Sequence, residues 1–164
     1  MTDTTTCAVG DTMVYPHHGP AVVEAVETRE IQGVKHKMVV LRCLGSQDLK
    51  VTVRVDRLTE LGVRKPVSKE DVDDLLEVLR RRDMRLPTNW SRRFKNHQEK
   101  LKTGDPYEVA EVVRNLEVRR RESGISNAER DMLAHARMTL TTELAISLGI
   151  DSDAAELIVD GAVA

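Results

Sequence analysis

The pattern of hydrophobic and polar residues changes its period once along the chain. The residues at 51–55 read Val-Thr-Val-Arg-Val, which places three valines on one side and Thr52 and Arg54 on the other. A period of two is typical of a half-buried β-strand. Two other β-prone runs precede it, at 21–31 and 37–43. A turn at 32–34 separates these two runs, and a turn at 44–47 follows the second. Residues 12–55 therefore predict three or four antiparallel strands in a small, strongly bent sheet or partial barrel.

After Pro66 the hydrophobic spacing becomes that of helices. A stripe of aliphatic residues at i, i+3, i+4 and i+7 predicts the first one: Val72, Leu75, Leu76 and Leu79. Ser68 and the acidic residues after it resemble a capping box at its start. The basic run at 80–82 follows the stripe, and we expect the helix to end at Leu86-Pro87, because the residue before a proline disfavours helical geometry.

Three further helices and a short terminal one follow from caps and spacing. One starts near Asn89 or Trp90 and stops before Gly104; the next opens with Asp105-Pro106 and closes at Gly124. Ser126 with Glu129 forms a second capping box. A short helix is expected at 153–159. The positions expected to be buried in the two central helices are Val109, Val112, Val113, Leu116, Met132, Leu133, Ala136, Leu140 and Leu144.

These two patterns predict an α+β protein with two domains. A small N-terminal antiparallel β domain is expected over residues 1–64 and an all-α helical bundle over residues 68–164. With 40% hydrophobic and 32% charged residues, the composition is that of a soluble globular protein. No apolar run approaches the roughly 20 residues that span a bilayer, and the N-terminus lacks the order of a secretory signal. We therefore expect a cytoplasmic protein without a membrane partner.

Positive charge is concentrated in one short segment. The net charge is −2, yet residues 87–104 carry five Lys or Arg against one Asp or Glu, and the only tryptophan, Trp90, lies there. On a helix, Arg92, Lys95 and Lys102 fall near one face, offset from Phe94 on the inner face. A cationic helix start beside an aromatic ring suits the phosphates and bases of a nucleic acid.

A structural interpretation of the same segment stays open at this point. Trp90 lies four residues before Phe94 and could share its buried face, which is the commoner fate of a lone tryptophan in a helical bundle. The arginines could then be a solvated surface without a ligand. The sequence pattern alone does not decide between the two.

Catalytic motifs are missing from the sequence. His17-His18 beside Tyr15 indicate a turn, because neighbouring histidines do not easily share a tetrahedral metal site. Cys7 and Cys43 form no Cys-x-x-Cys pattern and are expected to be ordinary thiols. No glycine-rich phosphate loop or nucleophile elbow occurs. We expect no enzyme activity, cofactor, metal or small-molecule substrate.

Several segments, in their order and spacing, resemble the CarD/CdnL family of bacterial RNA polymerase-binding transcription regulators, and within it the actinobacterial CarD proteins. The most specific is residues 87–95, Pro-Thr-Asn-Trp-Ser-Arg-Arg-Phe-Lys. The others are Val-Gly-Asp-Thr-Met-Val-Tyr-Pro-His-His-Gly at 9–19, Glu-Thr-Arg-Glu-Ile at 27–31, Thr-Val-Arg-Val at 52–55, Gly-Asp at 104–105, Ala-Glu-Val-Val-Arg at 110–114 and Ser-Asn-Ala-Glu-Arg at 126–130. The hairpin at 44–50 is longer than in the mycobacterial members.

The resemblance implies a Tudor-like N-terminal domain that docks on the β subunit of the polymerase holoenzyme, partly by extending a strand of that subunit. Arg29, Ile31 and Arg54 fall on the polymerase-contacting positions. It also implies a nucleoid-associated protein whose helical domain contacts promoter DNA at the upstream fork junction without sequence specificity, stabilising the open complex. The DNA-binding residues so implied are Trp90, Arg92, Arg93, Lys95 and Arg130. The alternative is a protein-only adaptor that links two partners through its β and helical modules.

Overall fold

The chain divides into two compact units, Met1–Pro66 and Val67–Ala164. The computed structural model describes residues 7–15, 19–44, 49–82 and 85–164. The predicted turn at His17-His18 and the part of the long hairpin at 45–48 lie outside the described residues.

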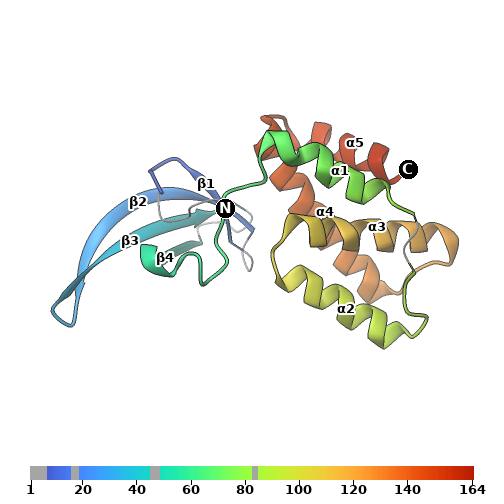
Figure 1. Ribbon diagram of the computed structural model, residues 1–164, viewed down its shortest axis with the longest axis horizontal. Helices are drawn as coiled ribbons and strands as arrows, with labels where there is room; N and C mark the ends of the chain where they lie inside the picture. The colour runs from blue at the N-terminus through green and yellow to red at the C-terminus, as the bar shows by residue number, and fades with distance from the viewer. Residues whose placement is uncertain (1–6, 16–18, 45–48, 83–84) are drawn as a thin grey trace. The chain divides into compact units, whose positions relative to one another are not determined.

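The first unit is a four-stranded antiparallel sheet, within the described residues, with the strands in sequence order. Its strands are β1 (Thr12–Tyr15), β2 (Gly19–Ile31), β3 (Val34–Cys43) and β4 (Lys50–Arg54), followed by a 3-10 turn at Val55–Arg57. The sheet curves strongly along β2 and β3 (Figure 1). The predicted bent antiparallel sheet is confirmed, and the strand runs match to within a few residues.

The register of the sheet separates a core face from an outer face. Val53 pairs with Val39 on β3, and Leu41 pairs with Val23 on β2; all four side chains are buried in one aliphatic cluster. Residues in between point the other way, since strand side chains alternate. A bulge between Val23 and Ala25 shifts the β2 alternation by one residue, so that the odd-numbered residues beyond it belong to the outer face.

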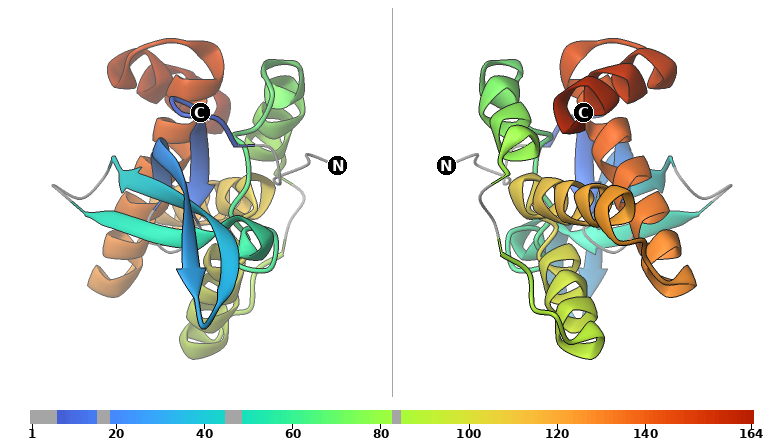
Figure 2. Two further views of the ribbon diagram at one scale, coloured as in Figure 1. Left: turned by 90° about the vertical axis from the view of Figure 1, so that its left-hand side faces the viewer. Right: turned by 90° about the vertical axis from the view of Figure 1, so that its right-hand side faces the viewer.

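The second unit is a bundle of helices, five of them α-helices within the described residues. They are α1 (Val72–Arg80), α2 (Trp90–Lys102), α3 (Pro106–Glu122), α4 (Asn127–Leu148) and α5 (Ser152–Val163). Contacts join α3 to α1, α2 and α4, and α5 to α1 and α4. Figures 1 and 2 show α3 lying between α1 and α2, with α5 on the side of α1.

Local capping explains why these helices begin where the sequence predicts. The side chains of the predicted cap residues each accept a hydrogen bond from a backbone N–H of the first turn: Ser68, Asn89, Asp105 and Ser126. The predicted apolar positions of α3 and α4 are all buried, and with α1 and α5 they form one core. The last helix is longer than expected and runs to Val163. No described helix is long and apolar enough to span a bilayer.

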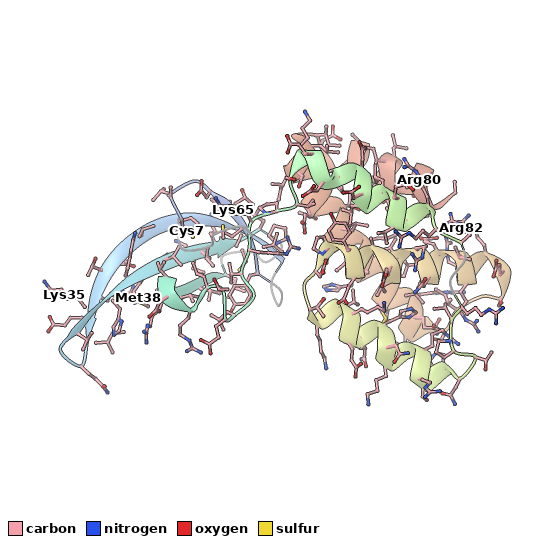
Figure 3. The ribbon with its side chains drawn as sticks, viewed as in Figure 1. Cys7, Lys35, Met38, Lys65, Arg80 and Arg82 are labelled. Carbon is pink, nitrogen blue, oxygen red and sulfur yellow. The ribbon has the colours of Figure 1, made fainter. Side chains whose placement is uncertain are left out.

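The predicted end of the first helix is wrong. The helix stops at Arg80, well before Leu86-Pro87, and Arg81 adopts an extended conformation. The Arg82 guanidinium turns back to donate hydrogen bonds to the carbonyls of Leu79 and Val163, at 2.8 and 2.6 Å. It thereby satisfies carbonyls left open at the C-terminal ends of two helices, α1 and α5 (Figure 3).

Candidate functional site

Trp90 is the first residue of α2 and stands at the surface of the helical unit. Its side chain is stacked on Phe94, with ring centroids 4.9 Å apart and ring planes 11° from parallel. The residue is 41% exposed. Asn89 precedes it and accepts a hydrogen bond from the Arg92 backbone N–H at 3.0 Å. The ring is thus open to solvent in part, and Phe94 supports one of its faces.

Arg93, one turn along α2, departs from the expectation that it faces DNA. Its side chain is only 3% exposed, and its Nε lies 3.0 Å from Oε2 of the equally buried Glu129 on α4. The same guanidinium donates to the backbone carbonyls of Pro87 and Thr88 at 3.2 and 3.4 Å. Its donors are therefore committed inside the protein, and Arg93 is corrected from a surface contact to a buried partner of Glu129.

Burial alone would raise the pKa of Glu129. Hydrogen bonds from the Arg93 guanidinium and from Ser126 outweigh that effect and lower this pKa below its usual value. Glu129 is therefore a carboxylate near neutral pH, and the pair that joins α2 to α4 is ionic.

Ser126 connects this buried pair to the exposed ring. As the cap of α4, its Oγ accepts from the Glu129 backbone N–H at 3.2 Å. The same oxygen accepts from the Trp90 indole Nε1–H at 3.0 Å and lies 3.2 Å from Glu129 Oε1, to which it can donate. The N-terminal ends of α2 and α4 are thus joined at two points, one exposed and one buried.

Exposed cations lie near the starts of the two helices that hold the ring. Arg92 and Lys95 on α2, and Arg130 on α4, are all exposed. Within the part of the chain that the structure describes, none of the three has a carboxylate within salt-bridge distance. Arg92 and Lys95 also line a shallow depression, together with Asn89, Ser91, Asn96 and Glu99. Cations that are exposed and lack a carboxylate partner are available to neutralise phosphates.

The sheet brings together the three candidate residues of the β unit. Arg29 pairs with His36 across β2 and β3, and Arg54 pairs with Met38 across β3 and β4. Because cross-strand partners share a face, as do residues two apart, Arg29, Ile31 and Arg54 all belong to the outer face. Ile31, near the tip of the β2–β3 hairpin, is 42% exposed.

The register also adds residues that the sequence did not single out. Val34 pairs with Ile31 and is 56% exposed, so two aliphatic side chains lie side by side next to the hairpin turn. Figure 3 shows Lys35 close to this tip and Met38 further along β3. Strand pairing was the signal that could have identified Val34, because a two-residue turn at 32–33 makes it the partner of Ile31.

Acidic neighbours hold both arginines of this face. Arg54 Nε donates to Asp56 Oδ1 at 3.0 Å, and Arg29 Nη2 donates to Glu27 Oε1 at 3.0 Å. The hydrogen bond from Arg54 lowers the pKa of Asp56. The two guanidiniums are thereby oriented on the surface, and both stay accessible to solvent.

Comparisons with known proteins match both units. The family model described as CarD, C-terminal domain, matches residues 74–160, and the CarD-like/TRCF RID domain model matches residues 8–67. The Bacillus subtilis (strain 168) protein YdeB, named as a candidate transcription factor, is 28% identical over 142 residues, which cover 87% of this chain and 92% of that protein.

Within the described residues, no group of three or more His, Cys, Asp or Glu side chains could hold a metal ion.

A solved structure is also similar in sequence to the first unit. The solution NMR structure of the 72-residue N-terminal domain of Myxococcus xanthus CarD is 35% identical, with a TM-score of 0.32. The match covers 37% of this chain and 79% of that structure. The C-terminal family model by itself spans more than half of the chain, and the second model accounts for most of the rest. The chain therefore belongs to the CarD family of transcription regulators.

Proposed function

We propose that this chain regulates transcription initiation by holding RNA polymerase with one unit and promoter DNA with the other. The β unit docks on the polymerase β subunit through the outer face of its sheet. The helical unit meets the upstream edge of the transcription bubble, where Trp90 wedges into the minor groove and opposes re-annealing. The open complex then lives longer, and no covalent chemistry is involved.

The observation that carries this proposal is the exposed indole of Trp90 at the start of a helix whose exposed cations Arg92 and Lys95 have no carboxylate partner among the described residues. A ring that is 41% exposed, with one face backed by Phe94, presents flat apolar surface to a base step. Arg92 and Lys95 on the same helix, and Arg130 on α4, supply exposed positive charge. Phosphate contacts of this kind position a protein on DNA and carry no sequence information.

The strength expected from these contacts explains the need for a second unit. Three or four phosphate contacts give weak binding, with a Kd on the order of 10⁻⁴ to 10⁻⁶ M at physiological salt. Docking on polymerase raises the effective DNA concentration to about the millimolar range. Unstacking a base step costs a few kcal/mol, and this cost is smallest where the duplex is already opening. Both effects localise the action at the bubble edge.

Docking through the β unit is supported by the composition of its outer face. Ile31 and Val34 offer exposed apolar area at the hairpin tip, while Arg29 and Arg54 offer oriented charge. Beyond residue 23 of β2, the strand pairs with β3 alone among the described residues, so the edge opposite β3 stays open. An open edge of this kind can add a strand from a partner.

The protein-only adaptor remains the competing function, and salt dependence separates the two. We expect the full chain to bind a fork-junction duplex with an affinity that falls about 40-fold between roughly 50 and 200 mM salt, as three phosphate contacts predict. Fluorescence anisotropy of labelled DNA measures this. A duplex of scrambled sequence should bind equally well.

The matched variants are Lys95→Ala and Arg80→Ala. Lys95→Ala should lower the slope of log Kd against log salt by about one. Arg80→Ala removes an exposed arginine of α1 that is paired with Glu77, and should leave the slope unchanged. Absence of DNA binding even at the lowest salt would support the adaptor instead.

A further inference from the structure

The hydrogen bond between Trp90 and Ser126 has consequences for the proposed role of the ring. A tryptophan on a helix surface can occupy several χ1 and χ2 rotamers, and stacking on Phe94 restrains the ring plane without fixing its direction. The indole has one hydrogen-bond donor, its Nε1–H. Ser126 Oγ accepts that hydrogen bond at 3.0 Å. The direction of the ring is therefore set by a residue of α4, although the ring itself belongs to α2.

The hydroxyl of Ser126 is fully used by this arrangement. A serine oxygen has two lone pairs and one proton. The lone pairs accept from Trp90 Nε1 and from the Glu129 backbone N–H, and the proton can go to Glu129 Oε1 at 3.2 Å. Alanine can make none of these bonds, whereas threonine keeps the same hydroxyl. The side chain is thus held at two points, both on Glu129, in addition to the bond from the indole.

The hydrogen bonds form a closed loop between two helix starts. On α2, Trp90 and Arg93 lie one turn apart; on α4, Ser126 and Glu129 lie one turn apart. Trp90 donates to Ser126, Ser126 is bound to Glu129, and Glu129 accepts from Arg93 at 3.0 and 3.3 Å. The buried ion pair at one end therefore fixes the exposed ring at the other.

We propose that Ser126 is a positioning residue that holds Trp90 in the orientation in which it meets DNA, with Arg93 and Glu129 as the buried support of that orientation. This inference rests on the function proposed above. A ring that is already oriented loses less rotamer freedom when it binds, so more of the contact energy appears as affinity. Arg93 then contributes to DNA binding without touching DNA.

The first test uses the fact that the chain has one tryptophan, so the single indole N–H resonance reports on this contact alone. In the full chain, Ser126→Ala should speed exchange of that proton with water by roughly fivefold or more, the factor expected from losing one neutral hydrogen bond. Ser126→Thr should keep the slow exchange. An exchange rate in Ser126→Ala equal to that of the wild type would overturn the inference.

Ser68→Ala is the matched control for the loss of a helix cap. Ser68 caps the start of the turn that leads into α1, and its Oγ accepts from the Asp71 N–H at 3.2 Å, the same length as the bond from Glu129 to Ser126. Within the described residues, no hydrogen bond joins Ser68 to the Trp90 indole. We expect Ser68→Ala to lower stability by a similar amount and to leave indole exchange unchanged. Faster exchange in both variants would overturn the inference, because the effect would then follow general stability.

The second test measures the lifetime of open complexes formed by the cognate RNA polymerase holoenzyme with each variant. Ser126→Ala should shorten the lifetime several-fold, by less than Trp90→Ala does, while Ser68→Ala and Ser126→Thr should match the wild type. If Trp90→Ala shortens the lifetime and Ser126→Ala does not, the positioning role is overturned and the proposed function stands. If Trp90→Ala also leaves the lifetime unchanged, the proposed function fails and the positioning role with it.

Discussion

Arg92 and Arg93 are neighbours with the same side chain and opposite environments. Successive residues of an α-helix point about 100° apart, so one faces solvent and the other faces α4. Arg92 has no carboxylate partner among the described residues, whereas Arg93 is enclosed with Glu129. If the helical unit binds DNA as proposed, a mutation at either position weakens that binding through a different physical cause.

Arg93→Met is expected to destabilise the helical unit by about 3 to 5 kcal/mol, because it leaves the Glu129 carboxylate buried without its partner. Arg92→Ala, at an exposed position, should change the free energy of unfolding by less than about 0.5 kcal/mol. Urea denaturation followed by far-UV circular dichroism measures both. Equal stabilities of the two variants would contradict the burial of Arg93.

Mild acid should weaken the helical unit through a buried histidine. His97 is buried on α2, and burial, with the nearby charges of Lys100, Arg93 and Arg114, outweighs the opposing charge of Glu129 and lowers its pKa to about 4. The unfolded chain takes up this proton near pH 6.5, so stability is lost as the pH falls from about 6.5 to 4, by about 3 kcal/mol in total.

His97→Gln should flatten that pH dependence, because glutamine does not titrate and can keep a hydrogen bond to Asn115. The measurement is the free energy of unfolding at pH 7, 5.5 and 4.5 for both proteins. Glu129 contributes to acid sensitivity only at lower pH. Its pKa in the folded protein is depressed, so the stability it provides is lost only as the pH falls through that pKa. If the stability of His97→Gln falls with pH as steeply as that of the wild type, His97 is not the source of the pH dependence.

The β2–β3 hairpin shows how a turn sets the geometry of the proposed docking face. Gln32 and Gly33 both have positive φ, of 50° and 78°, which is typical of a two-residue type I′ turn. Only glycine, and to a lesser degree asparagine, adopts these angles without strain. This turn sets Ile31 opposite Val34 and thereby determines which side chains the tip presents.

Substitutions at the two turn positions should have opposite signs. Gln32→Asn should stabilise the β unit by about 0.5 kcal/mol, because asparagine tolerates the left-handed region better than glutamine. Gly33→Ala should destabilise it by about 1 kcal/mol, since its φ is 78°. Thermal unfolding of the full chain gives both changes. A stabilising Gly33→Ala would be inconsistent with the observed turn.

Elements controlled by nearby residues could be predicted from the sequence, and elements controlled by distant ones could not. Ser126 and Glu129 mark the start of α4 because the cap bonds span only three residues. The end of α1 was missed because Arg82 reaches the carbonyl of Val163, which no local pattern indicates. The burial of Arg93 escaped prediction for the same reason, since Glu129 lies 36 residues away.

The proposed function combines two weak attachments in one molecule. The outer face of the sheet and the cationic end of α2 belong to different compact units, so we expect surface substitutions to affect one attachment at a time. Neither attachment needs high affinity by itself, because binding at one site raises the effective concentration at the other.

Reversal of charge at Arg54 should separate the two attachments. Arg54→Glu is expected to weaken polymerase association at least about 30-fold, as loss of an interfacial charge pair does, while DNA binding at low salt is unchanged. Lys35→Glu is the control, because alternation places it on the face opposite Val34 and His36. Co-purification with polymerase at equal protein concentration measures the effect. Equal recovery of Arg54→Glu and the wild type would remove Arg54 from the docking face.

The lifetime of the open complex after addition of a DNA competitor tests the central claim most directly. With Trp90→Ala, we predict a lifetime that falls toward that of polymerase alone, while folding and co-purification with polymerase stay as in the wild type. A wild-type lifetime with a variant that folds and still binds polymerase would contradict the claim that the exposed indole acts at the melted DNA edge.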